Sequence, residues 1–134
     1  MTEFSGRRRV AVTGLGVVNP FGGDLQDYFD RIMAGESAVR LYRHPQSPSP
    51  LAQCAVHCTD FDPAAVLGLP LTGVTDRYSQ LGLAAAFSAW QDAGLPPEAG
   101  DRPTFGVSWG TGAGGTQTLE QGYTDLYAKG RDRA

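Results

Sequence analysis

The sequence predicts an α/β fold in which helices cover the faces of a parallel or mixed sheet. Two short segments rich in β-branched residues, 8–13 and 104–109, have the composition of buried strands. Helical patterns follow each segment, so the predicted order is strand, helix, loop, helix, strand, helix. Strands joined through helices lie parallel, because a parallel pair needs a long crossover. Two or three strands are few for such a sheet, so we expect an incomplete one.

The first half of the chain predicts one clear helix and a long loop. Asp24 is a candidate N-cap, and apolar residues recur at helical spacing until Gly35 stops the pattern. The stretch 37–59 has no sustained period and contains three prolines, so we expect a surface loop there. Within it, 51–58 is a candidate short strand.

The middle of the chain predicts a short helix and then a long one. The short helix is capped within 60–63, where Pro63 suits a first helical turn, and it ends by Gly68; residues 70–74 are expected to be a connector. The long helix follows a cap at Thr75 or Asp76 and stops at Gly94. Its central part, 81–90, is apolar on nearly all sides, which is typical of a helix packed inside a larger body.

Composition limits the classes of function. The chain has 134 residues and 14.2 kDa, the size of one domain, and Gly plus Pro make up about a fifth of it, below low-complexity levels. Net charge is −3 and the pI is about 5.2, which argues against nucleic acid as a partner. No apolar run approaches the ~20 residues of a membrane span. We therefore expect a cytoplasmic protein that binds neither nucleic acid nor membrane.

Two glycine clusters are candidate binding loops. The first, 14–19, lacks the third glycine of a dinucleotide-binding turn, because Asn19 stands there, and 20–23 separates it from the following helix. The second, 110–115, lacks the lysine of a phosphate-cradling loop. It is either a tight crossover turn or a loop that lines a substrate site through Gly112, Ala113 and Gly114. A final helix is expected over 116–128.

No catalytic or metal-binding constellation is predicted, and no cofactor. His57 and Cys58 are neighbours, and neighbours on an extended strand point to opposite faces, so a dyad is geometrically poor. Adding Cys54 does not make a four-ligand zinc set, and we expect both thiols to be reduced. The remaining candidates fit structural or surface roles: His44 in the proline-rich loop, Asp60 and Asp62 as caps, and Arg7 to Arg9 as a solvated basic end.

Six blocks of the sequence, in order, resemble the β-ketoacyl-acyl carrier protein synthases. Residues 8–22, RRVAVTGLGVVNPFG, resemble the family's opening R-R-V-V-V-T-G-x-G-x-x-S-P-x-G. The later blocks are AGES at 34–37, DFDP at 60–63, DRYSQL with AAA over 76–86, QDAGL at 91–95 and GVSWGTGAGG at 106–115. The resemblance spans essentially the whole chain. It implies that residues 1–134 are the N-terminal portion of a thiolase-like condensing domain, cut before the catalytic cysteine block.

The resemblance implies an acyltransferase that condenses acyl and malonyl thioesters during fatty acid or polyketide elongation. In that family a cysteine takes the acyl group from a carrier protein, and two histidines assist decarboxylation and carbon–carbon bond formation. These three residues and a supporting lysine belong to motifs beyond residue 134. We therefore expect no catalytic residue in this chain and no activity from it alone.

Substrate lining and carrier docking are what the resemblance assigns to this segment. Ala113 stands where relatives often carry a bulky residue that gates the acyl tunnel, which suggests tolerance of longer acyl chains. Lys129, Arg131 and Arg133 lie where relatives carry basic residues near the approach of acyl carrier protein. The basic pair that often precedes the DR[FY] block is replaced by residues 73–75. A homodimer is implied for the full-length protein.

Two alternatives stay open at this point. One is a non-condensing partner subunit of the chain-length-factor kind, in which the nucleophile is replaced. The other is a small nucleotide- or ligand-binding α/β module that is complete at residue 134. Acyl chain length and the choice between fatty acid and polyketide pathways are not determined by the sequence.

Overall fold

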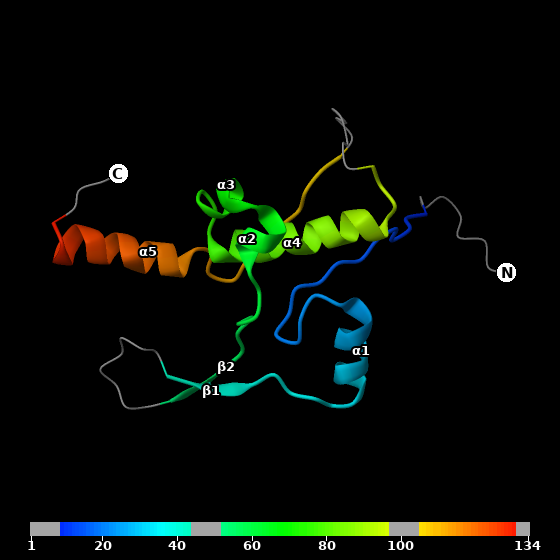
Figure 1. The fold of residues 1–134 in the computed structure, drawn as a ribbon, viewed down its shortest axis with the longest axis horizontal. Helices are drawn as coiled ribbons and strands as arrows, with labels where there is room; N and C mark the ends of the chain where they lie inside the picture. The colour runs from blue at the N-terminus through cyan, green and yellow to red at the C-terminus, as the bar shows by residue number, and fades with distance from the viewer. Residues whose placement is uncertain (1–8, 44–51, 97–104, 131–134) are drawn as a thin grey trace.

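A computed structural model describes residues 9–43, 52–96 and 105–130, and it contains one long helix from which the two strands stand apart (Figure 1). That helix is α4 (Arg77–Asp92). The other helices are α1 (Leu25–Met33), α2 (Pro63–Leu67), α3 (Leu69–Thr72) and α5 (Thr116–Tyr123), which continues into the π-helix η1 (Thr124–Ala128). The strands are β1 (Arg40–Tyr42) and β2 (Gln53–Ala55).

Helices with strong local caps were predicted correctly. Asp24 caps α1, where its Oδ1 accepts a hydrogen bond from the Asp27 N–H at 2.7 Å. Asp62 caps α2 through the Ala64 N–H at 2.9 Å, and Gly68 ends that helix with φ +79°. The cap satisfies backbone N–H groups that no carbonyl in the first turn can reach. The final helical stretch also matches the predicted 116–128, although its last five residues form a π-helix.

The connector predicted over 70–74 is wrong. Residues 69–72 form the short helix α3, in which Pro70 occupies one of the first two positions. A proline is compatible with a helix there, because the first N–H groups of a helix have no carbonyl partner anyway. Gly68 separates α2 from α3, so the two short helices meet at a corner.

The sheet differs from the predicted parallel arrangement. Among the described residues it consists of β1 and β2, which pair antiparallel with Arg40 opposite Ala55 and Tyr42 opposite Gln53. β2 lies within the predicted 51–58 segment, but β1 was not predicted. Residues 9–13 and 105–109, expected to be strands, belong to no ladder in the described chain. A ladder needs a neighbouring strand, which composition alone does not supply.

Gly14 and Gly16 place the N-terminal segment against α4. A Cβ on Gly14 would lie 2.7 Å from the Ala93 nitrogen, and one on Gly16 would lie 2.5 Å from the Ala89 nitrogen. These distances are too short for any side chain. The Leu15 N–H also donates to Asp92 Oδ2 at 2.8 Å. The first glycine cluster therefore serves backbone-to-helix packing.

The two segments predicted to be strands lie beside α4 and run in the same direction as each other. Gly14 lies against the end of α4 and Gly16 one turn earlier, so this segment runs antiparallel to the helix. Phe105 packs on Trp90 with ring centroids 5.5 Å apart, and Trp109 lies against Gly82. The second segment is thus also antiparallel to α4 and parallel to the first. The two segments therefore have the parallel direction that was predicted, but among the described residues they form no ladder with each other.

The core within the described residues is small. Its buried hydrophobic residues are Leu67 and Ala84, and the buried Gln80 donates to the carbonyls of Thr72 and Thr75. Many large apolar side chains are exposed, among them Val10, Val12 and Val107. None of the helices in the described ranges combines the length and the apolar character that a bilayer crossing requires.

Candidate functional site

The glycine-rich turn 110–115 connects the segment beside α4 to α5. Gly114 has φ +64°, a conformation that favours glycine, and its N–H donates to Thr111 Oγ1 at 3.1 Å. The carbonyl of Gly115 accepts from the Leu119 N–H at 3.0 Å, which begins the helix. The turn thus presents the backbone and the small Ala113 side chain beside the first turn of α5.

Asp76 joins the beginnings of α4 and α5. It occupies the N-cap position of α4, as predicted, but its carboxylate makes no cap hydrogen bond there. It accepts instead from the hydroxyl of Thr118 on α5. A Cβ on Gly115 would lie 2.6 Å from the Asp76 Cγ, so a side chain at this position would displace the Asp76 carboxylate from its present place. The predicted cap is therefore a link between two helices.

An open apolar groove of about 560 Å³ lies between this turn and one side of α5. Its lining includes Ala113 and the side chains of Leu119, Tyr123 and Leu126, with Asp76, Gly115, Thr118 and Gly122 completing it. A second groove of about 540 Å³ lies along the same helices, where Tyr127 stacks on Tyr123 with centroids 6.0 Å apart. The apolar wall of α5 was not predicted as part of a site.

The three predicted lining residues are neighbours in the turn but do not share one groove. Ala113 lines the 560 Å³ groove, whereas Gly114 lines a smaller hollow of about 220 Å³ next to Arg77 and Leu81. Gly112 lies outside both linings. Of the three, only Ala113 faces a space of the size expected for a small-molecule site.

Lys129, a predicted docking residue, lies at the end of η1 and is paired within its own helix. Its Nζ is 2.7 Å from Asp125 Oδ1, an i,i+4 ion pair at the surface. Hydrogen bonds from Lys129 and Gln121 lower the pKa of Asp125. Such an exposed pair contributes little to stability. The other two predicted docking residues, Arg131 and Arg133, lie outside the described residues.

The candidate nucleophiles are not assembled into a catalytic group. Cys54 is exposed on β2 and Cys58 is half-buried, and both are free thiols. Burial raises the pKa of Cys58, which the nearby Arg77 charge only partly offsets, and a raised pKa disfavours the reactive thiolate. His57 packs on Tyr42 with ring centroids 4.3 Å apart.

The acidic residues considered as catalytic or metal-binding candidates make local structural hydrogen bonds instead. Asp60 accepts from the Thr59 hydroxyl at 3.2 Å, and Asp62 caps α2. Across the three described ranges, no group of three His, Cys, Asp or Glu side chains is close enough to hold a metal ion. His44 lies outside the described residues.

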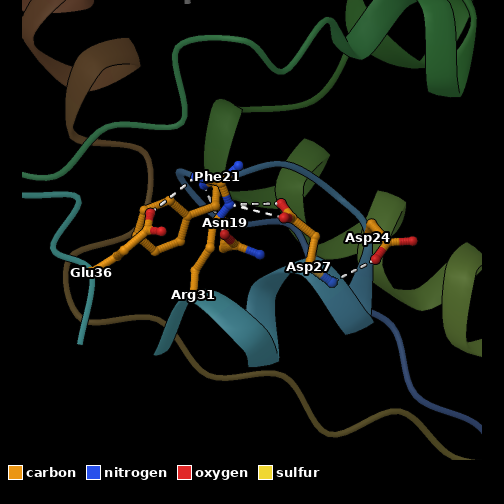
Figure 2. A network of polar contacts seen from close by, with 6 residues as sticks. All are labelled: Asn19, Phe21, Asp24, Asp27, Arg31 and Glu36. Carbon is orange, nitrogen blue, oxygen red and sulfur yellow. Dashed lines mark hydrogen bonds and ion pairs between the residues drawn. The ribbon is translucent and has the colours of Figure 1, made fainter. Parts of the chain in front are cut away.

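Sequence reasoning missed the polar network around the 19–22 turn and α1 (Figure 2). Asn19 and Gly22 exchange two backbone hydrogen bonds of 3.0 Å, and the Phe21 N–H donates to Asn19 Oδ1 at 2.8 Å. Arg31 lies over the Phe21 ring, 5.4 Å from its centroid. Asp27 and Glu36 each form an ion pair with Arg31, at 2.9 and 3.0 Å, and their hydrogen bonds raise its pKa.

Comparison with known proteins identifies relatives over nearly the whole chain. The family model "Beta-ketoacyl synthase, N-terminal domain" matches residues 7–133. The chain is 38% identical over 92% of its length to 3-oxoacyl-[acyl-carrier-protein] synthase 2 of Coxiella burnetii. It is 39% identical over 94% to a putative polyketide beta-ketoacyl synthase 1 of Streptomyces halstedii, and 34% identical over 96% to the actinorhodin polyketide putative beta-ketoacyl synthase 1 of Streptomyces coelicolor. The matched part of the chain covers 30%, 30% and 28% of the lengths of these three relatives, respectively.

Proposed function

Because the chain belongs to the β-ketoacyl synthase family and matches the N-terminal domain of that family, we propose that the full protein is a 3-oxoacyl-[acyl-carrier-protein] synthase. It condenses acyl and malonyl thioesters in fatty acid or polyketide elongation. Residues 1–134 are the N-terminal portion of its thiolase-like domain, and the protein acts in the cytoplasm as a homodimer. The chain-length-factor and nucleotide-binding alternatives receive no support from the matched relatives.

One observation supports a role of this segment in binding the acyl chain: Ala113 lines a groove whose other wall is apolar. Leu119 and Tyr123 on α5 and Leu126 on η1 present hydrocarbon and ring surface to the groove. An acyl chain gains roughly 0.8 kcal/mol for each methylene that it buries against such a surface. The small Ala113 side chain takes up little of the groove, and this supports the proposal that the segment lines part of the acyl site.

The chemical step belongs to groups outside these residues. The raised pKa of Cys58 does not fit an activated nucleophile, which needs a lowered pKa or an adjacent base. We assign the cysteine that carries the acyl group, and the two histidines that assist decarboxylation, to later motifs of the full protein. The chain by itself is then inactive.

The proposed partner is acyl carrier protein, an acidic protein with a phosphopantetheine arm. Lys129, Arg131 and Arg133 are the docking residues in this proposal. Because the Lys129 ammonium is already paired with Asp125, the two arginines are expected to carry most of the attraction. Reversing both arginine charges should weaken carrier binding and flatten its dependence on salt. Unchanged affinity and unchanged salt dependence would remove docking from the proposal.

The test of the proposed function is condensation by the full protein, with malonyl-carrier and a series of acyl-carriers of increasing length. Formation of 3-oxoacyl-carrier is expected. Ala113→Ile adds three carbons at the groove and should shift the preference to shorter acyl chains, by roughly tenfold for the longest substrates that fit. Ala34→Ile, at the exposed C-cap of α1, is the control and should leave the preference unchanged.

The two parts of this proposal fail in different ways. Absence of condensation with every acyl-carrier would refute the synthase assignment. Condensation with the same chain-length profile in the Ala113→Ile variant and the parent would keep the assignment but remove Ala113 from the acyl site.

A further inference from the structure

One face of the β1–β2 hairpin gathers polar and aromatic side chains. Directly opposite residues of an antiparallel pair share a face, and side chains alternate along each strand. Arg40 and Tyr42 on β1 therefore share a face with Ala55, the partner of Arg40 on β2. His57 follows two residues after Ala55 and packs on Tyr42. The small Ala55 side chain leaves space above the strands beside Arg40.

This face closes one side of a pocket of about 440 Å³. That volume lies within the range of small-molecule sites. The opposite side is the 19–22 turn, and the 59–60 segment completes the rim. The lining residues are Pro20, Phe21, Ala38, Arg40, Leu41, Tyr42, Ala55, His57, Thr59 and Asp60. The groove beside α5 shares none of these residues.

The Phe21 wall of the pocket is fixed from behind. Its N–H is held by Asn19, and the Arg31 guanidinium lies over its ring (Figure 2). Arg31 is itself held between Asp27 and Glu36. A wall that is positioned before a ligand arrives costs less entropy on binding.

Arg40 brings a cation that its surroundings do not neutralise. Its Nη1 donates to the carbonyls of Ser37 and Val39, at 2.8 and 2.9 Å. The ion pairs formed within the described ranges involve Arg31 and Lys129 but not Arg40. A guanidinium with free N–H groups is suited to a carboxylate. The Tyr42 and His57 rings, tilted by 33° to each other, line the same pocket and provide an aromatic surface.

We infer that this pocket binds a small aromatic carboxylate. The carboxylate pairs with Arg40, the ring packs against Tyr42 and His57, and a hydroxyl at the far end of the ring donates to Asp60. The inference does not rest on the condensing function, because the pocket is lined by the hairpin, its flanking residues and the 19–22 turn, and it shares no residue with the groove beside α5.

The experiment titrates 4-hydroxybenzoate into the full protein and follows binding by calorimetry and by ligand-observed NMR. Saturable binding with a Kd of about 1 mM or tighter is expected for a ligand of this size. Two comparison ligands separate the contacts: 4-hydroxybenzyl alcohol lacks the anion, and cyclohexanecarboxylate lacks the aromatic ring. Both should bind about tenfold more weakly, or not measurably.

Matched variants test the arginine. Arg40→Gln should weaken 4-hydroxybenzoate binding about tenfold or more, because it removes a charge-assisted contact. Arg43→Gln removes the same charge three residues away, outside the lining, and should leave the Kd unchanged. Tyr42→Leu should weaken the binding of 4-hydroxybenzoate and leave the binding of cyclohexanecarboxylate unchanged. Equal losses in the Arg40 and Arg43 variants, or no saturable binding by the parent protein, would overturn the inference.

Discussion

Gly82 offers a sharp test of the packing around α4, because a methyl group there collides with Trp109. A Cβ at this buried position would lie 2.7 Å from Trp109 Cη2 and 2.8 Å from Cε2. Ordinary carbon contacts are about 3.5–4.0 Å, so the indole has to move by about 1 Å or swing away. Gly82→Ala therefore improves the helix propensity of this position but disrupts the packing of Trp109 against α4.

Helix propensity gives the first magnitude, and the exposure of Trp109 gives the second. Replacing glycine by alanine inside a helix stabilises it by about 1 kcal/mol. Trp109 is 58% exposed, so about two fifths of its surface is covered. For an aromatic residue of roughly 200 Å², losing that cover costs about 2 kcal/mol at ~25 cal/mol/Å². Gly82→Ala is therefore expected to lower the free energy of unfolding by about 1 kcal/mol.

Gly122 provides the matched control. It lies inside α5, where a Cβ would meet nothing within 4 Å, so Gly122→Ala should raise the free energy of unfolding by up to about 1 kcal/mol. Urea unfolding of the full protein measures both, and tryptophan emission should shift to the red in Gly82→Ala as the indole becomes more exposed. In a Trp109→Ala background, Gly82→Ala should become stabilising. Equal stability changes at the two glycines, or no change of sign in that background, would refute the packing described here.

Two further predictions concern the described contacts. Asp76→Asn should lower the free energy of unfolding by about 1 kcal/mol, because a charged acceptor of the Thr118 hydroxyl is lost; thermal melts measure this, and combination with Thr118→Val should add little. At mildly alkaline pH, iodoacetamide should modify Cys54 before Cys58, because Cys54 is exposed whereas burial raises the Cys58 pKa; peptide mass spectrometry gives the order, and earlier modification of Cys58 would contradict the described environments.

Local signals in the sequence account for the elements that were predicted correctly. Asp24 and Asp62 mark helix starts because their carboxylates bind N–H groups only two or three residues away. Gly35 and Gly68 mark the ends through positive φ. All four features depend only on residues within one or two helical turns, so they can be recognised from the local sequence.

Non-local pairings account for what was missed. Residues 9–13 have the composition of a strand, but a ladder depends on a partner at a distance along the chain. β1 has three residues, too few for a period-two pattern to be recognised. Gly14 and Gly16 pack against α4, and their partners on that helix are more than 65 residues away in sequence.

The candidate site was predicted only in part, for the same reason. The glycine turn 110–115 was identifiable as a place where backbone approaches something closely. The apolar wall of α5 was not, because exposed Leu119 and Tyr123 look like core residues in a helical pattern. The hairpin pocket depends on the register of Arg40 against Ala55, which only the paired strands reveal.

The exposed valines beside α4 have a practical consequence for making this protein. Val10 and Val12 are 92% and 79% exposed, and Val107 is 95% exposed, in two segments that form no ladder within the described chain. Uncovered β-branched segments readily pair with the same segment of another molecule. Residues 1–134 expressed alone are therefore expected to accumulate in inclusion bodies, so biochemical work should start from the intact open reading frame.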